Sequence, residues 1–430
     1  MTKALRIAFS SSLLLVALTN RAVSSDQAKP TTTRAKYEAI LADYDLAMKR
    51  YKAKADKALY PDAADYSRRF VDLAASDPTD TASRDALIWV IMRCNWHFDN
   101  RFPLGEQLGR AVDLLIRHHS DDLGVARTAL ALNDRQSPNF DRLFNALHDR
   151  SKNREVKGIA CLVLGRHLHA KAWLVNWLHR EKEPPRFSYE ETDESGKTTT
   201  RRGEPIFEAA YETHLRSLKP DALDRESERL LLRVIAEYAD LPYVLCAGGA
   251  WADWTNRSLA RKQTLGQVAE ASLDELRNLA IGKPAPEIDA SCLDGKTRKL
   301  SDYRGKVVVL VFWGSWCGPC MARVPHERAL SERHKDRPFT FLGVDIETKR
   351  DEGLKAVSRE KMTWPNFYDG IADNGIPDKR SILARYHVHQ FPSMFVIDAK
   401  GVIRFKYPEA DEELDRAVDE LLKEAESPEK

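Results

Sequence analysis

Apolar residues recur at helical spacing through most of the chain before residue 280. Tyr37, Leu41 and Tyr44 lie three or four positions apart, which is the spacing of one face of an α-helix. The apolar–polar alternation of strands is scarce here. We therefore expect residues 35–280 to form an all-α helical domain of antiparallel helices, in a bundle or a solenoid-like stack. The pattern predicts helices at about 37–48, 66–75, 86–98, 108–119, 122–132, 140–149, 156–178, 207–218, 225–239 and 259–279.

Two stretches interrupt this helical pattern. Residues 183–205 contain Pro184-Pro185, three consecutive threonines and several charges. Adjacent prolines and clustered polar residues are typical of loops, so we expect an exposed loop inside the helical domain. Further on, Pro284 and Pro286 are only two positions apart. Because proline ends helical structure, they predict a domain boundary at residue 281.

The hydrophobic pattern changes after that boundary. Residues 306–313 form an almost continuous apolar run rich in valine, with a glycine on each side, which is typical of a buried parallel strand. Asp294-Gly295 predicts a hairpin turn. Residues 281–430 should therefore form an α/β domain with a mixed central sheet. We predict further strands at 339–345, 393–397 and 402–406, and helices after residue 317 and at 351–360, 379–385 and 412–424.

The chain begins with the features of a secretory signal peptide. Lys3 and Arg6 precede an apolar run at 7–18, and small residues follow at 22–24. This layout predicts a cleaved signal peptide over residues 1–24, with an uncleaved interfacial anchor as the alternative. We expect the polar residues 25–34 to be a disordered leader. The mature protein should then lie outside the cytoplasm, in the bacterial periplasm, where disulfides can persist.

Composition and charge narrow the range of partners. Charged residues make up 31% of the chain and hydrophobic residues 43%, as in soluble globular proteins. Removal of residues 1–24 takes away three basic residues and no acidic ones, so the formal charge falls from +2 to −1. A nearly neutral chain has no overall field that attracts nucleic acid. No later segment has the ~20 apolar residues of a membrane span. We therefore expect the mature protein neither to bind nucleic acid nor to span a membrane.

Two cysteines follow the apolar run of the α/β domain. Cys317 and Cys320 are separated by Gly318-Pro319, and this spacing lets the two thiols close a disulfide and open it again. The first thiolate can attack a foreign disulfide, and the second can release the resulting mixed disulfide. The pattern places Cys317 at a strand-to-helix junction. There the helix N-terminus would stabilise its thiolate and lower its pKa.

A permanent disulfide or half of a zinc site is the alternative for this pair. Zinc would need two more ligands, and the chain has no second Cys-x-x-Cys. His387 and His389 would share one face of a strand, as a metal site could use. His167 and His169 have the same spacing in a helical pattern, where residues two apart do not face each other. We predict no metal site and no cofactor.

Several motifs occur in order over residues 281–430. They are Gly282-Lys283-Pro284-Ala285-Pro286, the Asp294-Gly295 turn, Leu300-Ser301-Asp302-Tyr303-Arg304-Gly305-Lys306, the apolar run, Trp316-Cys317-Gly318-Pro319-Cys320, and Gln390-Phe391-Pro392-Ser393-Met394-Phe395-Val396-Ile397-Asp398. Together they resemble the thioredoxin superfamily, in particular the secreted TlpA/ResA-like thiol–disulfide oxidoreductases. The segment that includes Trp364-Pro365 is similar to an insertion in this subfamily.

The resemblance implies roles for the residues around the cysteine pair. Cys317 would be the nucleophile and Cys320 the resolving thiol. Gly318 and Pro319 would set the turn and the start of the helix. Trp316 would shield the pair and contact the partner, although simple packing would explain it equally well.

The resemblance also implies a substrate site and a direction of reaction. Pro392 would be a cis-proline that faces the disulfide and leaves the Phe391 backbone able to pair with an extended substrate segment. The partners would be protein disulfides and an upstream thiol donor, and the reaction would be reduction. Sequence alone does not define the direction, because potentials from roughly −270 to −120 mV occur with similar motifs. A protein partner of the helical region is a further expectation.

Two departures from the family pattern leave the proton acceptor of Cys320 open. Many thioredoxins have a buried aspartate where this chain has Val311, and some relatives have a glutamate where it has Arg323. Asp345, Glu347 and His389 are candidates by location alone. Arg323 could stabilise a thiolate by its charge, although a solvated arginine is the simpler expectation.

Two rival functions remain at this stage. A peroxiredoxin-like peroxidase would have a proline at Leu310 and a threonine at Gly314, and the chain has neither. The other alternative is a helical binding scaffold with a redox-inactive adaptor domain. The intact cysteine pair argues against it. The remaining cysteines should be free and buried, with a bridge among the first three as the alternative. They are Cys94, Cys161, Cys246 and Cys292.

Overall fold

The computed structural model describes residues 32–54, 60–93, 105–180, 186–192, 198–205, 207–244, 263–370, 381–388, 390–406 and 411–427. The predicted signal peptide and most of the predicted leader lie outside these ranges. Thr33 and Arg34, predicted to be disordered, instead begin the first helix. The Thr33 hydroxyl donates a hydrogen bond to Asp77 Oδ2 at 2.8 Å, which holds this end of the helix in place. No helix in the described ranges is long and apolar enough to cross a membrane.

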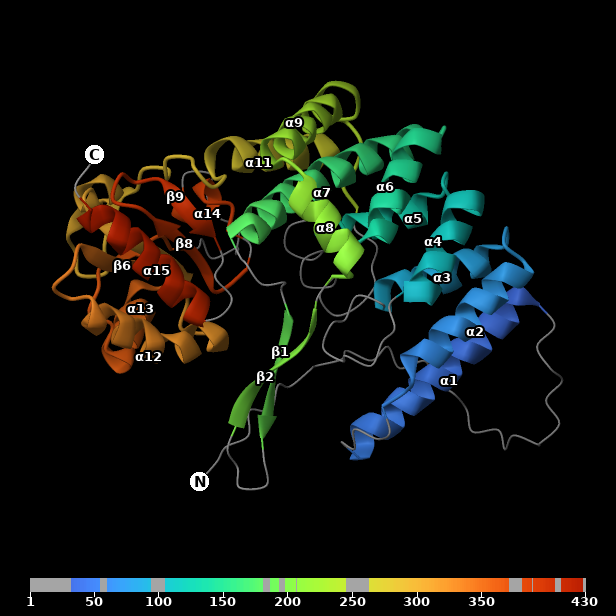
Figure 1. Cartoon of the computed structure of the whole chain (residues 1–430), viewed down its shortest axis with the longest axis horizontal. Helices are drawn as coiled ribbons and strands as arrows, with labels where there is room; N and C mark the ends of the chain where they lie inside the picture. Colours follow the sequence, from blue (N-terminus) through green and yellow to red (C-terminus); the bar gives the residue numbers. More distant parts are fainter. Residues whose placement is uncertain are drawn as a thin grey trace. The chain divides into compact units, whose positions relative to one another are not determined.

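The chain divides into two compact units. The first is helical, as predicted, and its helices pack on their neighbours in the chain, for example α1 on α2 and α6 on α7 (Figure 1). Its elements are α1 (Thr33–Lys54), α2 (Ala63–Ser76), α3 (Thr81–Arg93), α4 (Gly105–His118), α5 (Leu123–Leu130), α6 (Pro138–Arg150), α7 (Arg154–Arg180), β1 (Arg186–Thr192), β2 (Thr198–Pro205) and α8 (Ala209–Ser217).

Side-chain caps determine where several of these helices begin. The Asp62 carboxylate accepts hydrogen bonds from two backbone N–H groups at the start of α2. The Asp122 carboxylate accepts one, from the Val125 N–H, at the start of α5. Ser137 caps α6 and is followed directly by Pro138, which needs no N–H partner at that position. Each cap contributes about 1 kcal/mol. The short polar connectors in the sequence are therefore helix starts as well as linkers.

The prediction of a plain loop at residues 183–205 was wrong. The described parts of this segment are two paired antiparallel strands, in which Thr192 lies opposite Thr198 and Ser188 lies opposite Arg202. Threonine and aromatic residues favour strands, and each strand satisfies the backbone groups of the other. The polar content that suggested a loop is equally compatible with a two-stranded hairpin.

The second unit comprises residues 219–240 and 263–430. Helices α9 and α11 therefore group with the sheet, and the boundary at residue 281 stays a prediction based on periodicity. Lys406 on the last strand forms an ion pair with Glu275 of α11 at 2.9 Å, which links this helix to the sheet. The helices of the unit are α9 (Pro220–Glu237), α11 (Leu265–Asn278), α12 (Gly318–Arg333), α13 (Arg350–Glu360), α14 (Ile382–Arg385), α15 (Asp411–Glu426) and the 3₁₀ helix η3 (Leu300–Tyr303).

The centre of the second unit is the predicted mixed sheet, with strand order β7-β6-β5-β8-β9. Strands β5, β6 and β7 run parallel, whereas β8 and β9 are antiparallel to their neighbours. The short strand β7 was not predicted. The predicted Asp294-Gly295 turn joins β3 to β4, and Gly295 has the positive φ of 86° that such a turn requires. The strands are β3 (Asp289–Ser291), β4 (Thr297–Lys299), β5 (Val307–Trp313), β6 (Phe339–Asp345), β7 (Asn366–Tyr368), β8 (Ser393–Ile397) and β9 (Ile403–Lys406).

Both faces of the sheet are covered, which explains the apolar run. Successive side chains of a strand point to opposite faces, and every residue of β5 is buried. Val309, Val311 and Trp313 pack with residues of α12, α13 and α15, whose ribbons lie around the sheet in Figure 1. Leu310 and Phe312 pack with residues of α14 and of the β3–β4 segment. The carboxyl end of β5 leads directly to the cysteine pair.

Candidate active site

The cysteine pair lies at the junction between β5 and α12, as predicted. Cys317 is the N-cap residue of α12, and its sulfur accepts a hydrogen bond from the Cys320 N–H at 3.1 Å. The two cysteines form a disulfide with Cα atoms 5.2 Å apart. Both residues are buried. The disulfide form of the site is therefore compatible with the local backbone.

The helix start provides the electrostatic environment for a thiolate at Cys317. Gly318 and Pro319 occupy the first positions of α12, where proline fits because that N–H would have no helical partner. The partial positive charge of a helix N-terminus stabilises an anion. Once the disulfide is reduced, Cys317 is therefore the cysteine whose thiolate is favoured.

An exposed aromatic side chain lies beside the disulfide. Trp316 is 57% exposed and makes an edge contact with Phe391, with ring centroids 5.5 Å apart. A Cβ at Gly314 would lie 2.8 Å from Trp316 Nε1, so glycine permits this position of the indole. The peptide bond between Phe391 and Pro392 is cis, which confirms that prediction. The roles of these residues toward a substrate stay predictions.

Two of the predicted carboxylates lie near the loop that precedes the cysteines. Asp345 is fully buried at the end of β6, in register with Trp313. Burial, together with the negative charge of Glu347, raises the pKa of Asp345 to about 7. Glu347 Oε1 accepts a hydrogen bond from the Ser315 N–H at 2.5 Å, so this carboxylate positions the loop. The third candidate, His389, lies outside the described residues.

The expectation of a solvated Arg323 was wrong. Its side chain is 15% exposed, and its Nη2 pairs with Asp411 Oδ1 at the start of α15 at 3.2 Å. An acidic residue is favourable at a helix N-terminus, so Asp411 both stabilises the start of α15 and forms the ion pair with Arg323. The arginine therefore already has an anionic partner before any thiolate forms.

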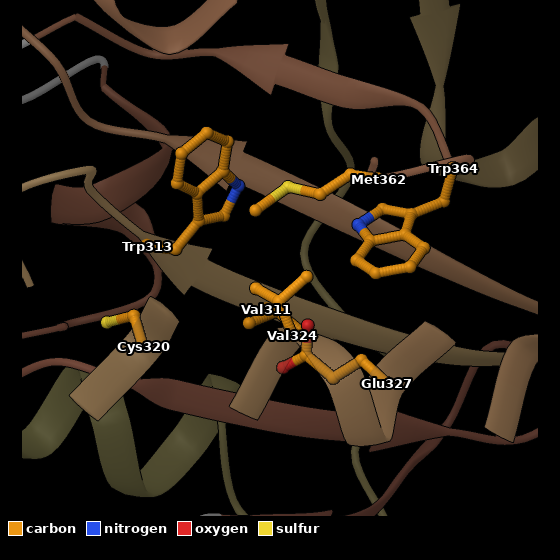
Figure 2. Close-up of a pocket in the computed structure, with 7 residues that line it drawn as sticks. All are labelled: Val311, Trp313, Cys320, Val324, Glu327, Met362 and Trp364. Atoms are coloured by element: carbon orange, nitrogen blue, oxygen red, sulfur yellow. The ribbon is translucent and has the colours of Figure 1, made fainter. Parts of the chain in front are cut away.

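Sequence reasoning missed one buried acid, Glu327. It is 3% exposed and lines a small cavity together with Cys320 (Figure 2). Burial raises the pKa of Glu327 to about 7, and the charge of Asp411 adds to the rise while Arg323 opposes it. One signal was present in the sequence. Glu327 follows Cys320 by seven positions, two helical turns, so both residues share a face of α12.

His387 does not lie on a strand, and His389 is outside the described residues. His387 follows α14 with a positive φ of 48°, and its Nε2 lies 2.7 Å from Asp274 Oδ2 of α11. Within the described ranges, no three histidine, cysteine or acidic side chains group as metal ligands.

The other cysteines are only partly described. Cys161 and Cys292 are buried, as predicted. Cys94 and Cys246 lie outside the described residues, so the alternative of a bridge among the first three cysteines stays open.

The chain is similar to known redox proteins over its C-terminal domain. The Redoxin family model matches residues 280–422. The thiol-disulfide oxidoreductase ResA of Geobacillus kaustophilus is 32% identical over 126 residues, which cover 29% of this chain and 68% of the relative. The thioredoxin-like protein YneN of Bacillus subtilis is 31% identical over 123 residues, again 29% of this chain and 68% of the relative.

Solved structures match the same part of the chain. One is the thioredoxin domain of a thiol-disulfide oxidoreductase from Bacteroides vulgatus, with 28% identity, a TM-score of 0.30, and coverage of 34% of this chain and 99% of that domain. Another is a thiol:disulfide interchange protein from a Bacteroides species, with 26% identity, a TM-score of 0.30, and coverage of 34% and 93%. Taken with the disulfide of Cys317 and Cys320 at the start of α12, the sequence relatives establish that this chain belongs, through its C-terminal domain, to the ResA-like thiol-disulfide oxidoreductases.

Proposed function

We propose that this protein reduces disulfides in protein substrates outside the cytoplasm through Cys317 and Cys320. The observation that carries the proposal is the disulfide formed by these residues at the N-terminus of α12. A helix N-terminus favours the thiolate that has to attack. The location outside the cytoplasm rests on the signal-peptide pattern of residues 1–24.

The two cysteines act in sequence. The Cys317 thiolate attacks one sulfur of the substrate disulfide, forms a mixed disulfide and releases the first substrate thiolate, which takes a proton from water. The Cys320 thiolate then attacks the sulfur of Cys317, and the second substrate thiolate leaves. The substrate gains two electrons and two protons, and the cysteine pair becomes a disulfide. An upstream dithiol donor reduces the pair again.

The exposed aromatic pair supports a protein as the substrate. Trp316 presents an apolar surface next to the disulfide, and its ring contacts Phe391 beside the cis peptide bond. Exposed tryptophan is enriched where proteins bind each other. A peptide segment that carries a disulfide would contact Trp316 on approach to Cys317. The partner of the helical region stays a prediction.

A redox titration of the chain tests this function. The protein is equilibrated with mixtures of reduced and oxidised dithiothreitol, and the free thiols are trapped and counted. We expect a reversible two-electron couple that Cys317→Ser abolishes and Cys292→Ser, a change at a buried cysteine away from the pair, preserves. A potential near −270 mV, as in thioredoxin, would support reduction, whereas one near −120 mV would indicate an oxidant. A folded protein without a reversible couple would overturn the proposal.

A further inference from the structure

We propose that Glu327 is the proton acceptor for the resolving thiol of Cys320, a proposal that rests on the disulfide-exchange function. Neither position at which the family pattern would place an acid has one, since Val311 and Arg323 occupy them. Glu327 provides a carboxylate from a third position, two turns along α12. Glu327 therefore supplies the carboxylate that is missing at positions 311 and 323.

The geometry brings the two side chains to one cavity. Cys320 and Glu327 both line it, and Val324 of the same helix lies between them. In Figure 2 the Glu327 carboxylate points toward the side on which Cys320 lies, while the Cys320 sulfur, bonded to Cys317, points away from it. The other walls are apolar or aromatic and come from β5 and from the segment after α13: Val311, Trp313, Met362 and Trp364. The space holds at most about one water molecule.

The charges around Glu327 suit a reversible proton acceptor. Its own helix contributes Arg323, α15 contributes Asp411, and these two neighbours pair with each other. Burial dominates the balance and raises the pKa of Glu327 to about 7. An acid with a pKa near the working pH can both accept and return a proton efficiently. The apolar walls also disfavour two negative charges, on Cys320 and Glu327, at the same time.

The proton moves in opposite directions in the two half-reactions. During substrate reduction, the Cys320 thiol passes its proton to the Glu327 carboxylate, and the resulting thiolate attacks Cys317 and closes the disulfide. During regeneration, a donor thiolate attacks Cys317 and the bond to Cys320 breaks. The departing Cys320 thiolate then takes the proton from the Glu327 carboxylic acid. Each step conserves electrons, because the donor dithiol is oxidised as the disulfide is reduced.

Two other acids near the loop are less suited to this role. Neither Asp345 nor Glu347 lines the cavity that contains Cys320. Glu347 is engaged by the Ser315 N–H, and Asp345 Oδ1 accepts from the Glu347 N–H at 3.3 Å. Because the pKa of Asp345 is also raised to about 7, a titration alone would not separate it from Glu327. The test therefore has to compare variants of both residues.

The experiment measures how fast dithiothreitol reduces the disulfide of the full chain between pH 5 and 9. Rates are divided by the fraction of dithiothreitol in the thiolate form, so that only the protein's own titration remains. For the wild type we expect the corrected rate to fall as pH rises through about 7, because protonated Glu327 is lost. In Glu327→Gln the inflection should vanish, and the rate at pH 6 should fall about 100-fold, the lower end of general acid catalysis.

Matched variants make the result specific. Glu332→Gln changes an exposed acid of the same helix and should keep both rate and inflection. The proposal is overturned if Glu327→Gln keeps the inflection, or if Asp345→Asn removes it instead. A wild-type disulfide that dithiothreitol cannot reduce reversibly would contradict the proposed function itself. If Glu327→Gln fails to fold, carboxyl carbon NMR of the wild type decides. We expect one glutamate carboxyl signal to titrate near pH 7, with a pKa that shifts when the disulfide is reduced. If no such signal is found, the proposal is overturned.

Discussion

The buried carboxyl of Glu327 should make the stability of the second unit depend on pH. Its pKa is about 7 in the folded chain and 4.5 ordinarily. The folded state therefore holds this proton more tightly than the unfolded state. As pH rises from about 4.5 to about 7, the unfolded state loses the proton first, and the free energy of unfolding falls. At 1.36 kcal/mol per pH unit, the full loss is about 3 kcal/mol. Solvent screens it little, because the side chain is 3% exposed.

Glu327→Gln removes this penalty while nearly keeping the shape of the side chain. Relative to the wild type, the variant should be more stable by about 3 kcal/mol at pH 8 and by less than about 1 kcal/mol at pH 5. For a unit of this size, the gain at pH 8 corresponds to a rise in Tm of about 6–12 °C. Asp345 titrates in the same range, so the difference between the two proteins isolates Glu327.

Thermal unfolding followed by near-UV circular dichroism at pH 5, 6, 7 and 8 measures this difference. Glu332→Gln, on the exposed face of the same helix, serves as the matched control and should follow the wild type at every pH. A gain in Tm that is equal at all four pH values would show that packing, not ionisation, causes it. No gain at pH 8 would refute the reasoning outright.

Three further predictions follow from the structure. Cys320→Ser should accumulate a mixed disulfide with a substrate protein, seen as a non-reducing gel shift, because Cys317 can attack but nothing resolves the product; absence of the adduct would contradict these roles. Gly353→Ala should lower the free energy of unfolding by about 1–3 kcal/mol, because the added Cβ would collide with Asp345 Oδ2. Denaturant titration measures this loss, and a second change, Asp345→Ala, should restore part of it. Asp141→Asn should destabilise the helical unit by about 2 kcal/mol in the same assay, because it breaks a partly buried ion pair with Lys171; an unchanged midpoint would show that the pair is dispensable.

Local patterns determined the elements that are buried on both faces. The strand at Phe339–Asp345 and the strand at Ser393–Ile397 have the predicted bounds, because short, mostly apolar segments are typical of strands in a sheet that is covered on both faces. The cysteine pair was equally predictable, since its spacing and its place after such a run define the chemistry.

Patterns with polar residues were less informative. The strands at 186–192 and 198–205 were predicted as a loop, because their formation depends on their pairing with each other. The grouping of α11 with the sheet depends on contacts such as Lys406 with Glu275, more than a hundred residues apart in the sequence. Such long-range contacts leave no trace in local periodicity.

The proton acceptor shows most clearly what the sequence determined and what tertiary structure decided. The sequence established a thiol–disulfide pair at a helix start and the absence of an acid at Val311 and Arg323. Its spacing put Glu327 on the same helix face as Cys320, but as a charged residue in a charged helix, for which solvent exposure is the usual state. Only the folded chain brings Met362 and Trp364 over that helix face, keeps bulk solvent away from the carboxyl and raises its pKa. Burial depends on residues distant in the chain, and for that reason the chemistry of Glu327 arises from the fold and not from its neighbours in sequence.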